Sequence, residues 1–207
     1  MLFRSRDKHN IVPVSRIWYW GWRNMTTLDR AVKKPEDLQG LKIRVPESPV
    51  WVEMIKAYGA APTPVPFGEV YTALQQKTVD GQENPIPTIF SRKFYEVQGF
   101  VAMTKHMLQN NMIVINKDSL ARLKPEHREV LFAEAARASA MNTYLQQKRE
   151  ASMLEDIRKS GRSKIVEDVD RDAFAAKSKV VATAMEGRWG KAHLKRVLAA
   201  IDKQRQR

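Results

Sequence analysis

The alternation of strand and helix patterns between residues 41 and 78 constrains the fold of this chain most. Leu41–Val45, LKIRV, alternates apolar and charged residues and is predicted to be a short strand. Pro49 fits the first turn of a helix, and a second helix is predicted over residues 68–78. Each proline of Ala61–Pro66 disfavours helix in the residue before it, so the segment between the two helices is expected to be extended. This succession predicts an α/β fold.

The rest of the chain is expected to continue this alternation. Further strands are predicted at residues 11–20, 99–104, 112–116 and 165–166, and helices at residues 124–160, 171–185 and 191–204. Of these strands, MIVIN at 112–116 has the clearest pattern of a short buried strand. Residues 79–85, VDGQENP, are polar and are expected to form a loop, in which Asp80 and Glu83 satisfy the backbone of a turn.

The composition excludes several kinds of chemistry. With no cysteine, the chain has no disulfide, thiol nucleophile or cysteine zinc site. Its four histidines lack metal-ligand spacing, and no nucleophile elbow or glycine-rich phosphate loop is found, so neither a metal nor a cofactor nor a catalytic residue is expected. The net charge of +13 raises one alternative, a basic module that binds nucleic acid or a membrane surface, although no nucleic-acid motif accompanies the charge.

Arg44 is the residue that most suggests a binding site. It stands near the C-terminal end of a predicted strand, next to a prolyl turn, where open α/β sheets hold ligands. A guanidinium is always charged and pairs with a carboxylate through two parallel hydrogen bonds. Arg23, after the aromatic run WYWGW, and Asn84, in QENP, are polar residues in similar positions. Taken alone, this spacing favours a structural salt bridge at Arg44 over a ligand contact.

Four motifs in one order carry a family resemblance: GLKIRVP, GAAPTPVPFGEVYTALQQ, VDGQENP and KFYEVQ. Over about Trp18–Gly161 the chain resembles the DctP-type solute-binding proteins of tripartite ATP-independent periplasmic (TRAP) transporters. The resemblance implies a periplasmic-binding-protein-like, two-lobed Venus flytrap fold. It also implies a periplasmic receptor that captures a small organic anion and delivers it to a membrane permease, with no bond made or broken.

The resemblance also implies roles for five residues. Arg44 matches the arginine that pairs with the ligand carboxylate, Arg23 fits a second arginine, and Asn84 fits a ligand-contacting asparagine. Glu47 and Phe67 fit pocket positions that vary with substrate. Because Glu47 would repel a second acidic group, a hydroxyl-rich monocarboxylate such as a sugar acid is expected over a dicarboxylate. An enzyme acting on a carboxylate remains an alternative, since arginines also orient substrates.

The resemblance further implies that the chain is an N-terminally truncated member, since mature members carry an export signal and a further segment that supplies most of the first lobe. The start MLFRSR resembles nothing in the family. Such a chain is expected to expose apolar surface and to bind ligand weakly or not at all. The sequence indicates no oligomeric state.

Four segments are expected. Residues 1–21 lead into the crossover between the lobes, and residues 22–109 form the first part of the second lobe. Residues 110–149 are a remnant of the first lobe, and residues 150–207 contribute the end of a long helix and the C-terminal helices of the second lobe.

Overall fold

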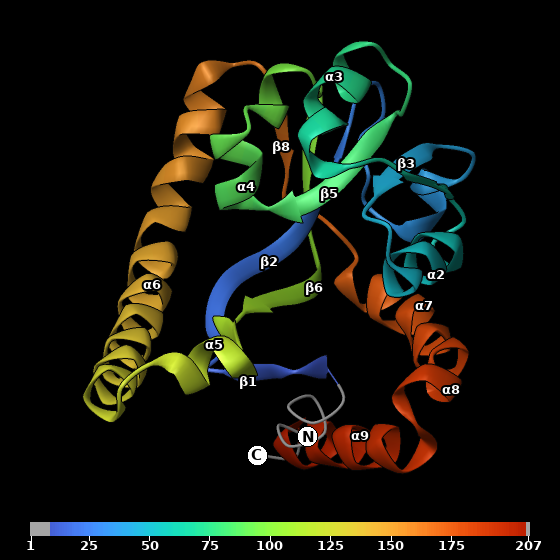
Figure 1. Cartoon of the computed structure of the whole chain (residues 1–207). Helices are drawn as coiled ribbons and strands as arrows, with labels where there is room; N and C mark the ends of the chain where they lie inside the picture. The colour runs from blue at the N-terminus through green and yellow to red at the C-terminus, as the bar shows by residue number, and fades with distance from the viewer. Residues whose placement is uncertain (1–8, 206–207) are drawn as a thin grey trace.

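A computed structural model of the protein describes residues 9–205. Its centre is a six-stranded mixed sheet in the order β4-β3-β5-β2-β6-β8 (Figure 1). Strand β3 is parallel to β4 and β5, β2 is antiparallel to β5 and β6, and β8 is parallel to β6. The six strands are β2 (Trp18–Thr27), β3 (Lys42–Val45), β4 (Ala61–Pro64), β5 (Gly81–Pro85), β6 (Phe100–Asn111) and β8 (Lys164–Val166).

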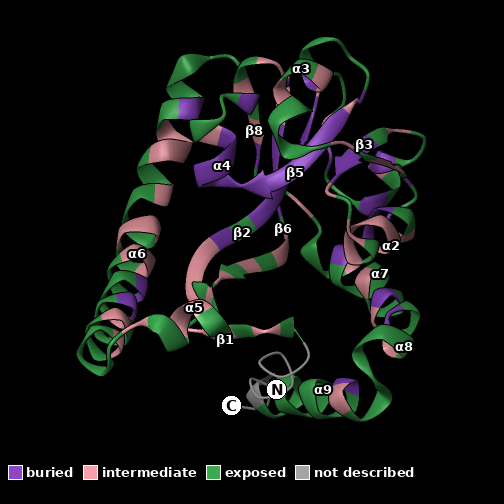
Figure 2. Cartoon of the chain, viewed as in Figure 1, coloured by how far each residue is buried: buried purple, intermediate pink, exposed green. Residues whose placement is uncertain are grey.

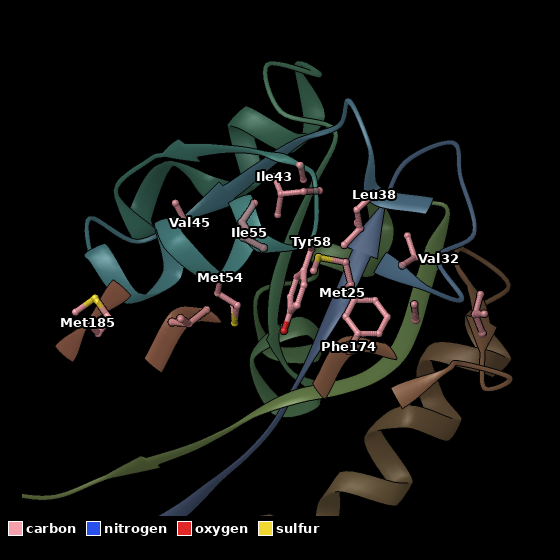
Figure 3. Packing of buried hydrophobic residues seen from close by; sticks show 14 residues of the cluster. Met25, Val32, Leu38, Ile43, Val45, Met54, Ile55, Tyr58, Phe174 and Met185 are labelled. Atoms are coloured by element: carbon pink, nitrogen blue, oxygen red, sulfur yellow. The ribbon is translucent and has the colours of Figure 1, made fainter. Parts of the chain in front are cut away.

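Helices cover both faces of this sheet. On one face, α2 (Pro49–Ala57) and α7 (Arg171–Ala184) enclose an apolar core that includes Met25, Tyr58 and Phe174 (Figure 3). The other core lies under α3, α4 and the end of α6, where Ile157 of α6 is fully buried. The result is a helix–sheet–helix arrangement whose centre is buried throughout (Figure 2). The helices of this second face are α3 (Val70–Gln75), α4 (Ile86–Ser91) and α6 (Pro125–Ser160).

The remaining elements lie at the margins of the sheet. Short 3-10 turns are found at Pro35–Leu38, Phe67–Glu69 and Phe94–Glu96. Strands β1 (Ile11–Pro13) and β7 (Val114–Asn116) form a separate antiparallel pair. Three helices complete the chain, α5 (Lys117–Arg122), α8 (Glu186–Trp189) and α9 (Lys191–Arg205). Among the described residues, no helix combines the length and apolarity required to cross a membrane.

Two hydrogen bonds fix the long helix α6 to the start of β2. The backbone N–H of Tyr19 donates to the Thr143 hydroxyl at 3.2 Å, and the Tyr19 hydroxyl donates to Glu150 at 2.6 Å. Burial, followed by the hydrogen bond and the charge of Glu150, raises the pKa of Tyr19, so this hydroxyl keeps its proton. Strands β2 and β6 run from the sheet toward β1 and α5, and α6 follows them along one side of the molecule (Figure 1).

The predicted α/β fold and most of its elements are found, but the predicted loop at residues 79–85 is wrong. Residues Gly81–Pro85 form the central strand β5, and all five are buried (Figure 2). The strand tolerates burial because its polar side chains bond with their neighbours: the Gln82 amide donates to Thr26 at 3.0 Å, and Glu83 pairs with Arg23. Asp80 accepts from the backbone N–H of Lys42, so only this acidic residue has a backbone-capping role.

Three strand predictions need smaller corrections. The strand expected at 11–20 is split, since residues 14–17 lie between β1 and β2, and the strand expected at 99–104 continues to Asn111 as β6. The strand expected at 112–116 is shortened to β7 and is exposed rather than buried, because it pairs only with the short β1 at the margin of the fold. Val114 remains 47% exposed.

Apolar side chains are exposed on the marginal elements. They belong to β1 and β7 with their flanks, to the first half of α6 and to α9, and include Ile11, Met112, Ile113, Val114, Val130, Phe132, Met141, Tyr144, Val197, Leu198 and Ile201. The expected exposure of apolar surface is therefore observed among the described residues. The start MLFRSR and the beginning of the predicted 1–21 segment lie outside them. The predicted division into lobes stays a prediction.

Candidate anion-binding site

A cavity of about 320 Å³ opens where β3 and β5 end. Its volume is within the range of small-ligand pockets, roughly 300–1,000 Å³. The C-terminal ends of the parallel strands β3 and β5 meet here, as expected for the ligand site of an open α/β sheet. The lining residues are Trp20, Arg23, Arg44, Pro46, Ser48, Trp51, Phe67, Asn84, Thr88, Gln109 and Asn111.

Arg44 is a buried cation with unused hydrogen-bond donors. Its side chain comes from β3, is 3% exposed, and donates from Nε and Nη2 to the Val65 carbonyl at 2.9 and 2.7 Å. A guanidinium has five N–H donors, so three are left, and Arg44 forms no ion pair with any described residue. Burial lowers the pKa of Arg44, with Glu83 opposing and Arg23 adding to the effect, yet a guanidinium stays charged in proteins. Arg44 therefore lines the cavity as an unpaired charge.

Aromatic rings border both arginines. The Arg44 guanidinium carbon lies 5.8 Å from the ring centre of Phe67, and that of the exposed Arg92 lies 4.9 Å from the same ring. The Arg23 guanidinium carbon lies 5.5 Å from the ring centre of Trp51. The indole nitrogen of Trp51 is buried and has no partner among the described residues. These rings restrict where the two guanidinium groups can move.

Arg23 is paired internally, unlike Arg44. Its Nε donates to one carboxylate oxygen of Glu83, and its Nη2 donates to the other at 2.7 Å and to the Glu83 carbonyl at 2.5 Å. Its Nη1 donates to the side-chain oxygen of Gln109. Burial raises the pKa of Glu83, but the charge of Arg23 and hydrogen bonds from His106 and Arg23 outweigh it and hold the pKa below its usual value. The pair is therefore ionised and electrically balanced.

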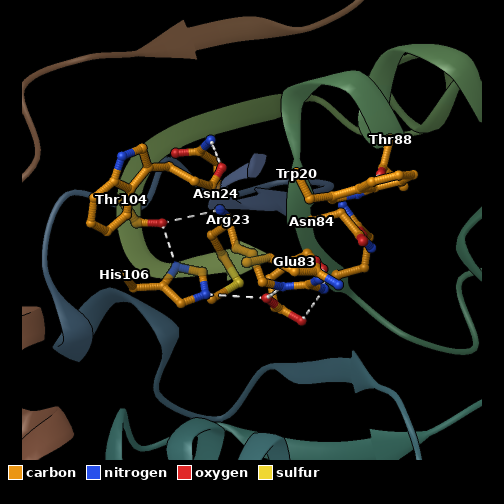
Figure 4. Close-up of polar contacts among 12 residues, drawn as sticks. Trp20, Arg23, Asn24, Glu83, Asn84, Thr88, Thr104 and His106 are labelled. Atoms are coloured by element: carbon orange, nitrogen blue, oxygen red, sulfur yellow. Dashed lines mark hydrogen bonds and ion pairs between the residues drawn. The ribbon is translucent and has the colours of Figure 1, made fainter. Parts of the chain in front are cut away.

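Two further residues support Glu83 from behind the cavity. His106 Nε2 lies 3.2 Å from a Glu83 oxygen, and His106 Nδ1 lies 2.7 Å from the Thr104 hydroxyl (Figure 4). The side chains of His106 and Glu83 are both fully buried. Both His106 and Thr104 come from β6, whereas Glu83 comes from β5 and Arg23 from β2. One polar network thus joins three neighbouring strands.

Uncharged polar groups complete the wall of the cavity. The Asn84 amide donates to Gln82 at 2.6 Å, and its carbonyl oxygen accepts no hydrogen bond from the described residues. The Trp20 indole N–H donates to the Thr88 hydroxyl at 3.1 Å, which joins the start of β2 to α4 (Figure 4). No group of three metal-ligating side chains occurs among residues 9–205 that the structure describes. The wall offers amide and hydroxyl groups that can hydrogen-bond an organic anion.

Four of the five predicted site residues line this cavity: Arg44, Arg23, Asn84 and Phe67. Glu47 is exposed and lies outside the lining, so the structure gives no support to an argument about ligand charge that rests on it. The binding roles of all five residues stay predictions.

Sequence reasoning missed the indoles and β6 residues of the wall. Trp20 and Trp51 carry no signal that separates a wall residue from a core residue. Gln109 and Asn111 lie on the part of β6 beyond the predicted strand end. Had the strand been predicted to continue to Asn111, its pairing with β2 would have placed these two amides near Arg23.

A small α/β cavity with a buried arginine that has no acidic partner among the described residues has the chemistry of a site for an organic anion. The chain belongs to the DctP family, since residues 1–187 match the family described as bacterial extracellular solute-binding protein, family 7. The predicted family and fold class are both confirmed. The family and its solved structures are solute-binding proteins rather than enzymes.

Three relatives illustrate the match. The 2,3-diketo-L-gulonate-binding periplasmic protein YiaO of Escherichia coli is 39% identical over 164 residues, which cover 79% of this chain and 50% of that protein. A TRAP periplasmic solute binding protein of Shewanella oneidensis with bound succinate has a TM-score of 0.88 at 29% identity, covering 96% of this chain and 65% of that one. A Roseobacter denitrificans protein of the same kind with bound L-galactonate has a TM-score of 0.81 at 34% identity, covering 88% and 60%. The chain thus spans about half the length of the curated relatives it matches.

Proposed function

We propose that this chain is part of a TRAP-transporter solute receptor and that Arg44 holds the carboxylate of a small organic anion. One observation carries the proposal: Arg44 is 3% exposed and has no acidic partner among the described residues. An unpaired buried charge is costly, and a ligand carboxylate would neutralise it with charge-assisted hydrogen bonds. The three unused N–H donors of Arg44 are enough for a bidentate contact.

The ligand class we favour is a sugar acid or a similar hydroxylated monocarboxylate. Amide and hydroxyl groups from Ser48, Asn84, Thr88, Gln109 and Asn111 line the cavity and match the hydroxyls of such a ligand. Glu83 balances Arg23, so Arg44 is the one arginine of the lining without a partner charge among the described residues. The relatives with L-galactonate and 2,3-diketo-L-gulonate in their names support this choice, whereas the relative with succinate supports a dicarboxylate.

The family supports two further parts of the proposal, a periplasmic location and delivery of the ligand to a membrane permease. In this function the ligand is held without any bond being made or broken. Binding shifts the receptor from an open to a closed population, because the closed form gives the carboxylate more contacts. Since the chain spans about half the length of its curated relatives, we expect its own affinity to be weak.

An NMR titration of this chain with L-galactonate, succinate and a neutral hexitol tests the proposal, because chemical shifts detect weak binding. We expect L-galactonate to shift signals of the cavity residues, the hexitol to leave them unchanged, and Arg44→Ala to abolish the shifts. Arg92→Ala is the matched control, because Arg92 also lies against Phe67 but is outside the lining. Equal shifts in Arg44→Ala and the wild type would overturn the assignment of Arg44.

A further inference from the structure

Thr88 belongs to the wall of the cavity, where α4 begins directly after β5. We propose that Thr88 is a specificity-determining residue that donates its hydroxyl hydrogen to an oxygen of the ligand. The oxygen that fits best carries no hydrogen of its own, as in the ring oxygen of a cyclic sugar acid or the carbonyl of a hydroxylated oxo acid. The inference rests on the proposed function, because it names the oxygen that the cavity selects within that ligand class.

The position of the Thr88 hydroxyl is fixed from two sides. The Trp20 indole N–H donates to the hydroxyl oxygen at 3.1 Å, and both residues line the cavity (Figure 4). Thr88 is 6% exposed, and its neighbours Ile86, Pro87 and Ile89 in α4 are buried as well. Because a β-branched side chain has few χ1 rotamers, the hydroxyl has little freedom to turn away from Trp20.

The hydrogen of this hydroxyl has no acceptor in the described part of the chain. A threonine hydroxyl has one hydrogen and two lone pairs, and Trp20 takes one of the lone pairs. No described residue accepts the hydrogen, and a buried donor without a partner is costly. Since Thr88 lines the cavity, a ligand oxygen is the partner that this hydrogen can reach.

Asn84, in the same wall, offers the opposite polarity. Its amide nitrogen donates to Gln82 at 2.6 Å, and its oxygen accepts no hydrogen bond from the described residues. The Asn84 oxygen therefore suits a ligand hydroxyl, whereas Arg44 suits the carboxylate. Ser48 and Asn111 make no side-chain hydrogen bond with the described residues, so each can act as donor or acceptor and neither selects.

Together these groups match one arrangement of ligand oxygens. A ring oxygen or carbonyl would accept from Thr88, an adjacent hydroxyl would donate to Asn84, and the carboxylate would pair with Arg44. A ligand hydroxyl can also accept from Thr88, but its own hydrogen then needs a further acceptor in the wall. An oxygen without a hydrogen has no such requirement, and we therefore expect it to bind more tightly.

Two pairs of acids test this inference by NMR titration of the chain. D-galacturonate has a ring oxygen where L-galactonate has a hydroxyl, and hydroxypyruvate has a carbonyl where D-glycerate has a hydroxyl. Thr88→Val removes the hydroxyl from a side chain of nearly the same shape, and Thr88→Ser is the matched control that keeps it. Hydrogen exchange of the Trp20 indole N–H is followed in the same proteins without ligand.

We expect the acid with the hydrogen-free oxygen to bind about tenfold more tightly in at least one pair, and that pair identifies the source of the oxygen. Thr88→Ser should keep this preference and Thr88→Val should lose it. The Trp20 indole N–H should exchange about tenfold faster in Thr88→Val than in Thr88→Ser.

Three results would overturn the role of Thr88: no preference in either pair, a preference that survives in Thr88→Val, or equal indole exchange in the two variants. If none of the four acids binds to the wild type, the proposed function fails. The indole exchange is measured without ligand, so it still decides whether the Thr88 hydroxyl is held by Trp20.

Discussion

Arg23 and Arg44 are the same residue type in two different electrostatic settings. Arg23 is paired bidentately with Glu83, whereas Arg44 bonds only to a backbone carbonyl among the described residues. Removing one partner of a buried pair leaves an uncompensated charge, whereas removing a cation that has no partner relieves a desolvation cost. The same substitution should therefore destabilise the chain much more at Arg23 than at Arg44.

We predict that Arg23→Met lowers the free energy of unfolding by about 3–5 kcal/mol, because it leaves the Glu83 carboxylate buried and unpaired. Arg44→Met should change it by less than about 1 kcal/mol or raise it, because a methionine fills similar space without a charge. Urea denaturation of both variants measures the difference. The double variant Arg23→Met with Glu83→Gln should recover part of the loss, and equal losses at the two arginines would contradict this account.

Glu83 also predicts how stability depends on pH. Its pKa is lower in the folded chain than in the unfolded chain, where it is about 4.3. At a pH above the pKa of the unfolded chain, the ionised Glu83 contributes its full share to the free energy of unfolding. As the pH falls below that pKa, the unfolded chain takes up the proton first, and this share is lost. Urea midpoints measured from about pH 6 to about pH 3 should therefore fall more steeply for wild type than for Glu83→Gln. Parallel curves would show that Glu83 has an ordinary pKa in the folded chain.

At the scale of elements, β5 shows what the sequence could and could not predict. The motif VDGQENP reads as a loop because its side chains are polar, yet Gly81–Pro85 is the central buried strand. Burial of this strand depends on partners such as Arg23 and Thr26, which are more than fifty residues away in the sequence. Local patterns carry no information on such pairing, whereas they predicted β3, α2 and α6 well because propensity, proline and glycine act locally.

The same reasoning applies to the candidate site. Arg44, Arg23 and Asn84 could be proposed because a cation or amide at a strand end is visible in the sequence, and the family resemblance added Phe67. His106 could not, since it lies on the part of β6 beyond the predicted strand end. Glu83 was predicted to satisfy the backbone of a turn, because the local sequence does not show that its partner belongs to another strand.

The close packing of β5 against β2 predicts the effect of one methyl group. A Cβ added at Gly81 would lie 2.2 Å from the Thr26 carbonyl oxygen, a backbone atom that cannot move without disturbing the sheet. We expect Gly81→Ala to destabilise the chain by about 3 kcal/mol or more. Gly68→Ala is the control, because a Cβ there meets nothing within 4 Å. Thermal unfolding of both variants tests this, and similar melting temperatures would contradict the packing of β5.

At the scale of the whole molecule, helices cover both faces of the sheet, whereas the elements at its margins leave apolar side chains exposed. Exposed apolar side chains gather on β7, on the first half of α6 and on α9, away from the two buried cores. The chain spans about half the length of its curated relatives. The net charge of +13 suggested a module that binds nucleic acid. The same charge would also attract a small anionic ligand.

The polar character of β5 also bears on the order in which the chain folds. A strand whose buried side chains include Gln82, Glu83 and Asn84 offers little apolar area to early collapse. Its hydrogen-bond partners on β2 and β6 come from distant parts of the sequence, and such long-range pairing is slow. The carboxylate that neutralises Arg23 can enter the interior only with its partners in place. We therefore expect β5 to join the sheet late, so that a newly made chain acquires its binding site in the last steps of folding.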